Sequence, residues 1–268
     1  MATLQAIIFD VDGTLAETER DGHRVAFNRA FAAANLSWHW DEDLYGELLT
    51  VAGGKERIRY FIDRYAQRDD PAYQLPAKLS DPADLSRLIA DLHAAKTIHY
   101  RQLVQDGKIP LRPGVRRLMD EARQLGIRLA IATTSAPDNV IALLETALGS
   151  DSPDWFAVIA AGDIVPAKKP APDIYHYVLD HLGLDPDGCL VIEDSQHGLA
   201  AASQAGLRTV VTVNDYTRHQ DFSQAVLVLD HLGDVGQPAR AIAGNLGTGT
   251  VLDVNLAQHL LTVPFPAR

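Results

Sequence analysis

The stretch LQAIIFDVDG, residues 4–13, decides the fold class of this chain. Its first six residues are short and apolar and include the β-branched pair Ile7 and Ile8, which is typical of a strand buried on both faces of a parallel sheet. The strand runs into an acidic turn, in which Asp10 and Asp12 precede Gly13. The segment therefore predicts the first strand of an α/β core, with two carboxylates at its carboxyl end.

The region from residue 108 onward alternates between strand and helix patterns. Alternation of this kind predicts a doubly wound, Rossmann-like parallel sheet covered by helices. A glycine-rich stretch, residues 233–249, predicts a loop before a last helix near residues 252–261. The expected strands are 128–132, 157–160, 189–192 and 209–213, and the expected helices are 115–125, 137–148, 172–182 and 198–205.

Residues 16–107 differ in character from the chain on either side. Apolar residues recur at the i, i+3, i+4 and i+7 spacing of a helix face, once from Ile58 to Tyr65 and again from Leu85 to Ala95. Few runs of β-branched residues occur here. We therefore predict an all-helical cap domain, residues 16–107, inserted into a core domain formed by residues 1–15 and 108–268.

Composition limits the classes of partner. The 268 residues contain 24 Lys and Arg against 35 Asp and Glu, a net charge of −11, which argues against nucleic acids and membrane surfaces as partners. A small anionic substrate needs only a local positive pocket. The single cysteine, Cys189, fits a reducing compartment, and the first residues lack the features of a signal peptide. A soluble, cytoplasmic monomer is expected.

Polar residues follow several of the expected strands. Ligands of open parallel sheets bind beyond the carboxyl ends of the strands, so these residues are candidates for one site. Asp10 and Asp12 lie two residues apart and can face the same side, and Asp194 adds a third carboxylate from a later strand. Close carboxylates repel and need a cation or a shared proton. Three hard oxygen donors without a Cys or His cluster favour Mg²⁺ over zinc.

Further residues complete a site for phosphate. Gly13 allows the backbone to approach an anion closely, and Thr133 and Lys169 can hold phosphate oxygens. Taken alone, the first acidic pair could be turn residues, and Asp194 with Ser195 could be a helix cap. Because all of these groups fall at strand ends, a catalytic site is favoured.

Four motifs in this chain resemble those of the haloacid dehalogenase superfamily. They begin at Asp10 (DVDGTL), at Thr133, at Lys169 (KPAPDIY) and at Glu193 (EDS, followed by Gly198). They occur in the order typical of that superfamily, and the helical insert resembles its cap domain. Superfamily members that are dehalogenases or phosphonate hydrolases lack the second aspartate, so the presence of Asp12 favours phosphate-ester or phosphomutase chemistry.

The resemblance implies a mechanism. Asp10 would attack phosphorus and form an aspartyl-phosphate, while Asp12 would protonate the leaving oxygen and then deprotonate the hydrolytic water. Thr133 and Lys169 would bind the transferred phosphoryl group. The implied Mg²⁺ ligands are Asp10, the backbone carbonyl of Asp12, Asp194 and, in a supporting role, Glu193. Such chemistry depends mainly on positioning and on charge neutralisation.

The substrate is expected to be recognised partly by the cap. Lys55 and Arg57 follow a glycine pair that opens a helix, where backbone N–H groups and cations can bind an anion. Lys96 lies on an otherwise apolar helical row, which is unusual for an inward face. Each of these cations could instead lie on a solvated surface. The predicted substrate-binding residues are Gly13, Glu17, His23, Gly53, Gly54, Lys55, Arg57, Lys96, Thr134 and Asn139.

Segments of the cap narrow the resemblance to the CbbY-type phosphatases. These segments begin at Glu17 (ETE), His23, Ala26 (AFN) and Gly53 (GGKER), and a further one begins at Asn214 (NDYT). The resemblance implies hydrolysis of xylulose-1,5-bisphosphate, an inhibitor of the Calvin-cycle enzyme Rubisco. A β-phosphoglucomutase-type phosphomutase and a general phosphoglycolate or sugar phosphatase remain alternatives. Residues 234–268 match no pattern.

Overall fold

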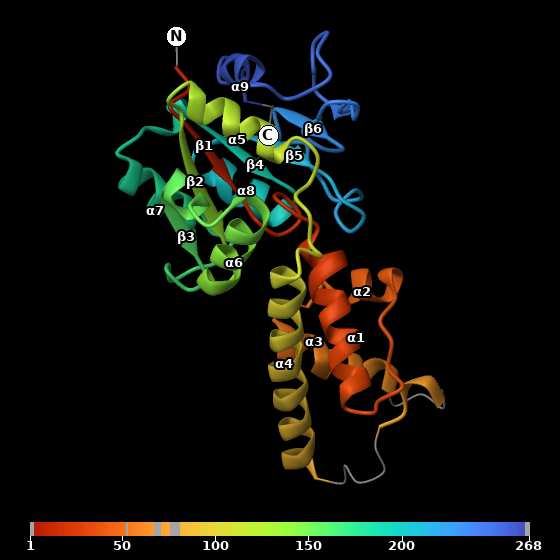
Figure 1. The fold of residues 1–268 in the computed structure, drawn as a ribbon. Helices are drawn as coiled ribbons and strands as arrows, with labels where there is room; N and C mark the ends of the chain where they lie inside the picture. Colours follow the sequence, from red (N-terminus) through yellow and green to blue (C-terminus); the bar gives the residue numbers. More distant parts are fainter. Residues whose placement is uncertain (1–2, 52, 67–70, 76–80, 266–268) are drawn as a thin grey trace. The chain divides into compact units, whose positions relative to one another are not determined.

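The computed structural model describes residues 3–51, 53–66, 71–75 and 81–265 (Figure 1). The chain forms two compact units, one made of residues 1–17 and 110–268 and the other of residues 18–109. Each predicted domain boundary lies two residues before the corresponding division. We call the first the core unit and the second the helical unit, and we describe each by itself.

The core unit is built on a seven-stranded sheet with the order β3-β2-β1-β4-β5-β6-β7. All neighbouring strands are parallel except β6 and β7, which pair antiparallel. The predicted doubly wound α/β fold is therefore confirmed. The strands are β1 (Ala6–Phe9), β2 (Arg128–Thr133), β3 (Phe156–Ala161), β4 (Cys189–Glu193), β5 (Arg208–Thr212), β6 (Leu227–Leu229) and β7 (Ala241–Ala243).

The direction of winding reverses between β1 and β4. From β1 the chain builds outward through β2 to β3, and it then returns to β4 on the other side of β1 and continues to β5. Such a reversal is where ligands bind in open α/β sheets. The register pairs Phe9 with both Ile131 and Ile192, so the next residues of the three strands lie side by side. Asp10 and Glu193 are two of these residues.

Helices cover the sheet, and its central strands β1 and β4 are fully buried. The helices of the core unit are α5 (Val115–Gln124), α6 (Pro137–Leu148), α7 (Asp173–Leu182), α8 (Gln196–Gln204) and α9 (Val254–Leu260). Helices α7 and α8 pack on small strand residues such as Ala130, Ala132 and Ala160 in one apolar cluster. Helix α5 packs on β2, and α9 packs on α5 (Figure 1). All four residues of β1 are buried, as a central strand requires.

The end of the chain departs from the sequence prediction. The glycine-rich stretch contains β7, which the sequence analysis placed in a loop. Its three residues are all exposed at the sheet edge, so the strand has no buried face that an apolar pattern could reveal. The short strand β6 was also missed. The last helix was predicted correctly and is α9.

The helical unit contains α1 (Arg24–Ala33), α2 (Glu42–Leu48), α3 (Gly54–Phe61) and α4 (Pro82–Gln105), with short π-helical segments at Thr18–His23 and Ile62–Ala66 and a 3₁₀ turn at Pro71–Tyr73. Its core is aromatic, since Phe27, Trp40 and Phe61 are fully buried. Asp41 and Asp81 cap α2 and α4 by accepting hydrogen bonds from backbone N–H groups. Among the described residues, no helix has both the length and the apolar character of a membrane span.

Candidate active site

Lys169 forms hydrogen bonds with residues at the carboxyl ends of β1, β2 and β4. Its Nζ donates hydrogen bonds to Asp10 Oδ1 at 2.8 Å, to the Ala132 carbonyl at 2.8 Å and to Glu193 Oε1 at 2.5 Å. The Lys169 side chain is only 7% exposed, so these charge-assisted bonds lie in a medium that screens them weakly. The structure thus brings together groups that lie up to 183 residues apart in the sequence.

Glu193 is fully buried and is held at both carboxylate oxygens. Oε1 also accepts a hydrogen bond from the Tyr175 hydroxyl at 2.8 Å, and Oε2 accepts from the backbone N–H groups of Asp194 at 3.1 Å and Ser195 at 3.4 Å. The carboxylate lies against the first turn of α8, where a Cβ at Gly198 would come within 1.9 Å of Glu193 Oε1. The glycine of the fourth motif therefore makes room for this acid.

Asp194 is the third acid of the cluster. Ligand oxygens of Asp10, Glu193 and Asp194 all lie within 4.8 Å of one another, and all three residues are buried. Among the described residues, Asp10 and Asp194 are each hydrogen-bonded through one side-chain oxygen, whereas Glu193 uses both. Asp10 and Asp194 are therefore the better placed to hold a hard cation, and the donor set fits Mg²⁺.

The charge balance of the cluster favours a cation. Burial, followed by the charges of Glu193 and Asp12, raises the pKa of Asp10 to about 7 although Lys169 opposes the rise. Burial and then the charges of Glu193 and Asp10 raise the pKa of Asp194 well above its usual range. For Lys169, burial alone would lower the pKa, but Asp10 and Glu193 outweigh burial and raise it. One ammonium therefore does not neutralise these acids, and a divalent cation would.

Asp12 is engaged by a serine that the sequence analysis did not select. The Ser135 hydroxyl donates a hydrogen bond to Asp12 Oδ2. Thr133 is buried at the end of β2, and its hydroxyl accepts a hydrogen bond from the Ser135 N–H at 3.2 Å. Of the residues predicted to bind substrate nearby, Thr134 is exposed and Asn139 is half-buried in α6. Ser135 directly follows the predicted pair Thr133 and Thr134, which was the available signal.

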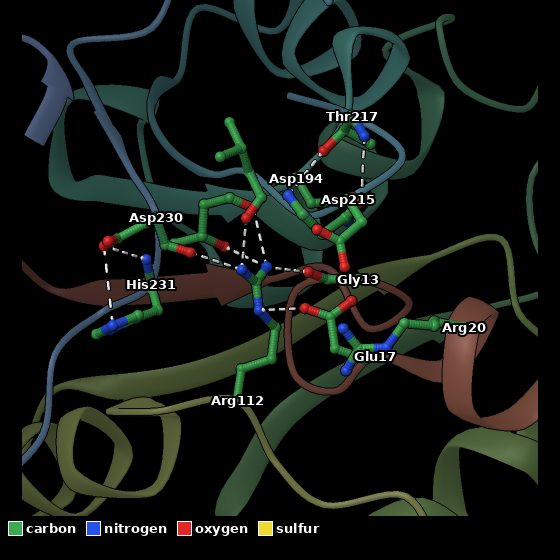
Figure 2. Close-up of polar contacts among 12 residues, drawn as sticks. Gly13, Glu17, Arg20, Arg112, Asp194, Asp215, Thr217, Asp230 and His231 are labelled. Carbon is green, nitrogen blue, oxygen red and sulfur yellow. Dashed lines mark hydrogen bonds and ion pairs between the residues drawn. The ribbon is translucent and has the colours of Figure 1, made fainter. Parts of the chain in front are cut away.

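Arg112 links the loop that follows β1 to the loop that follows β5, and it was not among the residues predicted from the sequence. Figure 2 shows its guanidinium at the centre of a network of carbonyl oxygens. It donates to the carbonyls of Gly13, Thr212 at 2.9 Å and Val213 at 2.6 Å, and its Nε lies 2.9 Å from Glu17 Oε1. Glu17 was predicted to bind substrate, and the structure shows its carboxylate paired with this arginine. The partners of Arg112 are backbone carbonyls about 100 residues away, so the sequence around Arg112 does not indicate them.

The helical unit contains a group of cations and histidines. The ring of His23 packs against Tyr100 with centroids 4.1 Å apart, and Lys96 Nζ lies 5.4 Å from the Tyr100 centroid. Burial, followed by the charges of Lys96, Arg57 and His93, lowers the pKa of His23 well below its usual value. We call His23, His93, Lys55, Arg57 and Lys96 the cationic cluster.

Within the cationic cluster, Lys55 and Arg57 do not act as the pair that the sequence suggested. Lys55 is exposed, whereas Arg57 is buried, donates to the Tyr45 hydroxyl at 2.8 Å and lies 3.8 Å from Glu19 Oε2. Residues two apart on a helix point in different directions, which explains the difference.

The glycine pair that opens α3 has a packing role that the sequence did not reveal. A Cβ at Gly54 would come within 2.6 Å of the His93 ring, so Gly54 allows α3 to approach α4 closely. Gly53 precedes the helix with φ 91°, which suits glycine. Burial, followed by the charges of Lys96 and Lys55, lowers the pKa of His93.

Comparisons with known proteins agree with this geometry. A model of the haloacid dehalogenase-like hydrolases matches residues 4–206. The plasmid-encoded CbbY protein of Cupriavidus necator is 48% identical over 235 residues, which cover 88% of each chain. The structure of CbbY from Rhodobacter sphaeroides with phosphate matches at 47% identity with a TM-score of 0.71, covering 87% of this chain and 97% of that one. A mutant of that CbbY in complex with xylulose-1,5-bisphosphate matches at 46% identity, also with a TM-score of 0.71, covering 87% and 98%.

Proposed function

The chain belongs to the haloacid dehalogenase-like hydrolases and, within them, to the CbbY proteins, and on that premise we propose that it is a Mg²⁺-dependent phosphatase of xylulose-1,5-bisphosphate. The observation that carries the proposal is the convergence of Asp10, Lys169 and Asp194 at the reversal point of the sheet. In the cytoplasm such an activity would remove an inhibitor of the Calvin-cycle enzyme Rubisco. A monomer remains our prediction.

Asp10 is the proposed nucleophile. A carboxylate oxygen of Asp10 attacks phosphorus, the bond from phosphorus to the ester oxygen breaks, and an aspartyl-phosphate forms. Lys169, which is bonded to Asp10, and the Thr133 hydroxyl bind oxygens of the transferred phosphoryl group. Mg²⁺, held by Asp10, the Asp12 carbonyl and Asp194 with Glu193 in support, would neutralise charge on that group.

Asp12 is the proposed acid and base. Its carboxyl group gives a proton to the leaving oxygen and then takes a proton from the water that hydrolyses the aspartyl-phosphate. The Ser135 hydroxyl bonds Oδ2 of Asp12, which supports a fixed orientation for the side chain. A group that must both give and take a proton benefits from such orientation.

The cationic cluster supports a substrate with a second phosphate. Lys96 lowers the pKa of both His23 and His93, Arg57 contributes at His23 and Lys55 contributes at His93, so positive charge gathers in this part of the helical unit. Phosphate groups are bound by such charge, and a monophosphate would not need a second site of this kind. We therefore propose that this cluster binds the distal phosphate, with Gly13, Gly53, Gly54, Thr134 and Asn139 as further candidate contacts.

A substrate panel tests the proposal. Release of inorganic phosphate would be measured for xylulose-1,5-bisphosphate, xylulose 5-phosphate, phosphoglycolate and an aryl phosphate, with Mg²⁺ and with EDTA. We expect Mg²⁺-dependent release from the bisphosphate at a kcat/KM well above the others. Equal values across the panel would contradict the bisphosphate assignment. An isomerised sugar phosphate formed without net phosphate release would instead identify a phosphomutase.

A further inference from the structure

We propose that Asn214 is a positioning residue, whose side-chain amide orients the Asp194 carboxylate toward the cation. The inference rests on the Mg²⁺ site of the proposed function but not on the identity of the substrate. Asn214 Nδ2 donates a hydrogen bond to Asp194 Oδ2 at 2.6 Å, and both residues are buried. The segment that begins at Asn214 resembles CbbY-type phosphatases, yet Asn214 takes no part in the proposed catalytic steps.

The orientation of the Asn214 amide is fixed by the loop after β5. Its Oδ1 accepts hydrogen bonds from the backbone N–H groups of Tyr216 at 2.9 Å and Thr217 at 3.1 Å. The Asn214 N–H in turn donates to the Thr217 hydroxyl at 3.1 Å. Because Oδ1 is used by the turn, the amide must present Nδ2, its donor end, to Asp194.

The loop itself is anchored by Arg112. This side chain bonds the carbonyls of Thr212 and Val213, immediately before Asn214, and also the carbonyl of Gly13 (Figure 2). A Cβ at Gly13 would come within 2.2 Å of Asp194 Oδ2 and 2.6 Å of Asn214 Nδ2. The three segments are therefore packed closely, and Asp194 has little room to turn away.

The hydrogen bond from Asn214 determines which oxygen of Asp194 is available to a cation. Nδ2 can only donate, so it holds Oδ2 as an acceptor and leaves Oδ1 as the oxygen offered to a cation. Partners that orient a metal ligand in this way typically change metal affinity by about 10–100-fold when they are removed. Asn214 should therefore control Mg²⁺ affinity without contacting the substrate.

The test is isothermal titration of Mg²⁺ into the purified protein without substrate. Asn214→Asp keeps the oxygen that the turn needs and nearly the same shape, but it replaces the donor that faces Asp194 with an acceptor. Asn245→Asp is the matched control, because exposed Asn245 also accepts a backbone bond two residues on, from Gly247 at 2.8 Å. We expect Asn214→Asp to raise the Mg²⁺ Kd by about 10–100-fold and Asn245→Asp to leave it unchanged.

Activity provides an independent readout. In Asn214→Asp, kcat should recover as Mg²⁺ is raised and the substrate KM should stay near wild type, which a general loss of structure would not produce. If Asn214→Asp does not fold, Asn214→Ser serves instead, since its hydroxyl can accept from the turn but cannot reach Asp194. A folded variant whose Mg²⁺ Kd equals that of wild type would overturn the inference, as would a wild-type protein that binds no Mg²⁺. Weakened Mg²⁺ binding in a protein that hydrolyses no sugar phosphate would support the inference and reject the proposed function.

Discussion

At the level of single residues, the proposed hydrolysis depends on the Asp10 carboxylate. Replacing Asp10 with asparagine keeps the size of the side chain but removes the nucleophile, so kcat should fall by about three orders of magnitude or more. Steady-state phosphate release would measure the loss, and circular dichroism would show that the fold persists. If Asp10→Asn kept more than about a tenth of the wild-type kcat, Asp10 would not be the nucleophile.

Replacing Gly198 with alanine tests whether the Glu193 carboxylate needs the space beside residue 198. Alanine favours a helix over glycine by about 1 kcal/mol, so Gly198→Ala would stabilise α8 if room existed. Its Cβ would instead come within 1.9 Å of Glu193 Oε1. We expect overpacking to lower the free energy of unfolding in urea by about 1–3 kcal/mol. Exposed Gly249, where a Cβ meets only ordinary contacts, is the control, and equal stability of the two variants would refute the close approach.

The residues with rare chemistry could be predicted from the sequence, whereas the residues that hold them in place could not. Asp10, Lys169 and Asp194 stood out because carboxylates and a lysine at strand ends have few structural uses. Arg112 and Asn214 act on backbone carbonyls and on one distant acid, and nothing in their neighbours records those partners. Contacts of this kind become visible only when the sheet is assembled.

At the scale of elements, packing of α1 and α4 in the helical unit creates a pH dependence. His23, just before α1, is packed against Tyr100 of α4, and burial with nearby cations depresses its pKa well below 6.5. The unfolded chain therefore takes up the proton first as pH falls, so this histidine lowers stability at pH values below about 6.5. Above that value both states are neutral and the effect disappears.

His23→Gln should make stability less sensitive to acid. The free energy of unfolding in urea, measured at pH 7.5 and 5.5, should fall less for His23→Gln than for wild type. His39→Gln, at an exposed position, should keep the wild-type difference. The comparison uses the difference between the two pH values, so a uniform packing loss in His23→Gln cancels. An identical difference in all three proteins would contradict the depressed pKa.

Elements were predicted well where a buried face imposed a period. The helices that became α5, α6 and α7 were placed within a residue or so of their observed ends, and Gly183 ends α7 in the left-handed conformation that favours glycine. The edge strand β7 was missed because its exposed residues carry no such period. Lys55 and Arg57 were predicted to bind an anion together because both follow the glycine pair that opens a helix, but the geometry of α3 separates their side chains.

At the scale of the whole molecule, the site follows from topology. Motifs spread from residue 10 to residue 198 converge because parallel strands present their carboxyl ends at one edge of the sheet. That rule made the convergence predictable from the order of strands along the chain. The individual hydrogen bonds of the acids could not be predicted from strand order, because they depend on side-chain packing. Glu193 is hydrogen-bonded at both oxygens, and Asp194 is hydrogen-bonded to Asn214.

The roles of Asp10 as nucleophile and Asp194 as cation ligand can be tested together by a crystal structure of the protein with Mg²⁺ and the phosphoryl mimic BeF₃⁻. We predict beryllium bonded to a carboxylate oxygen of Asp10, fluorines contacting Lys169 and Thr133, and Mg²⁺ contacting both Asp10 and Asp194. A mimic bound away from Asp10, or a cation that does not contact Asp194, would contradict the account.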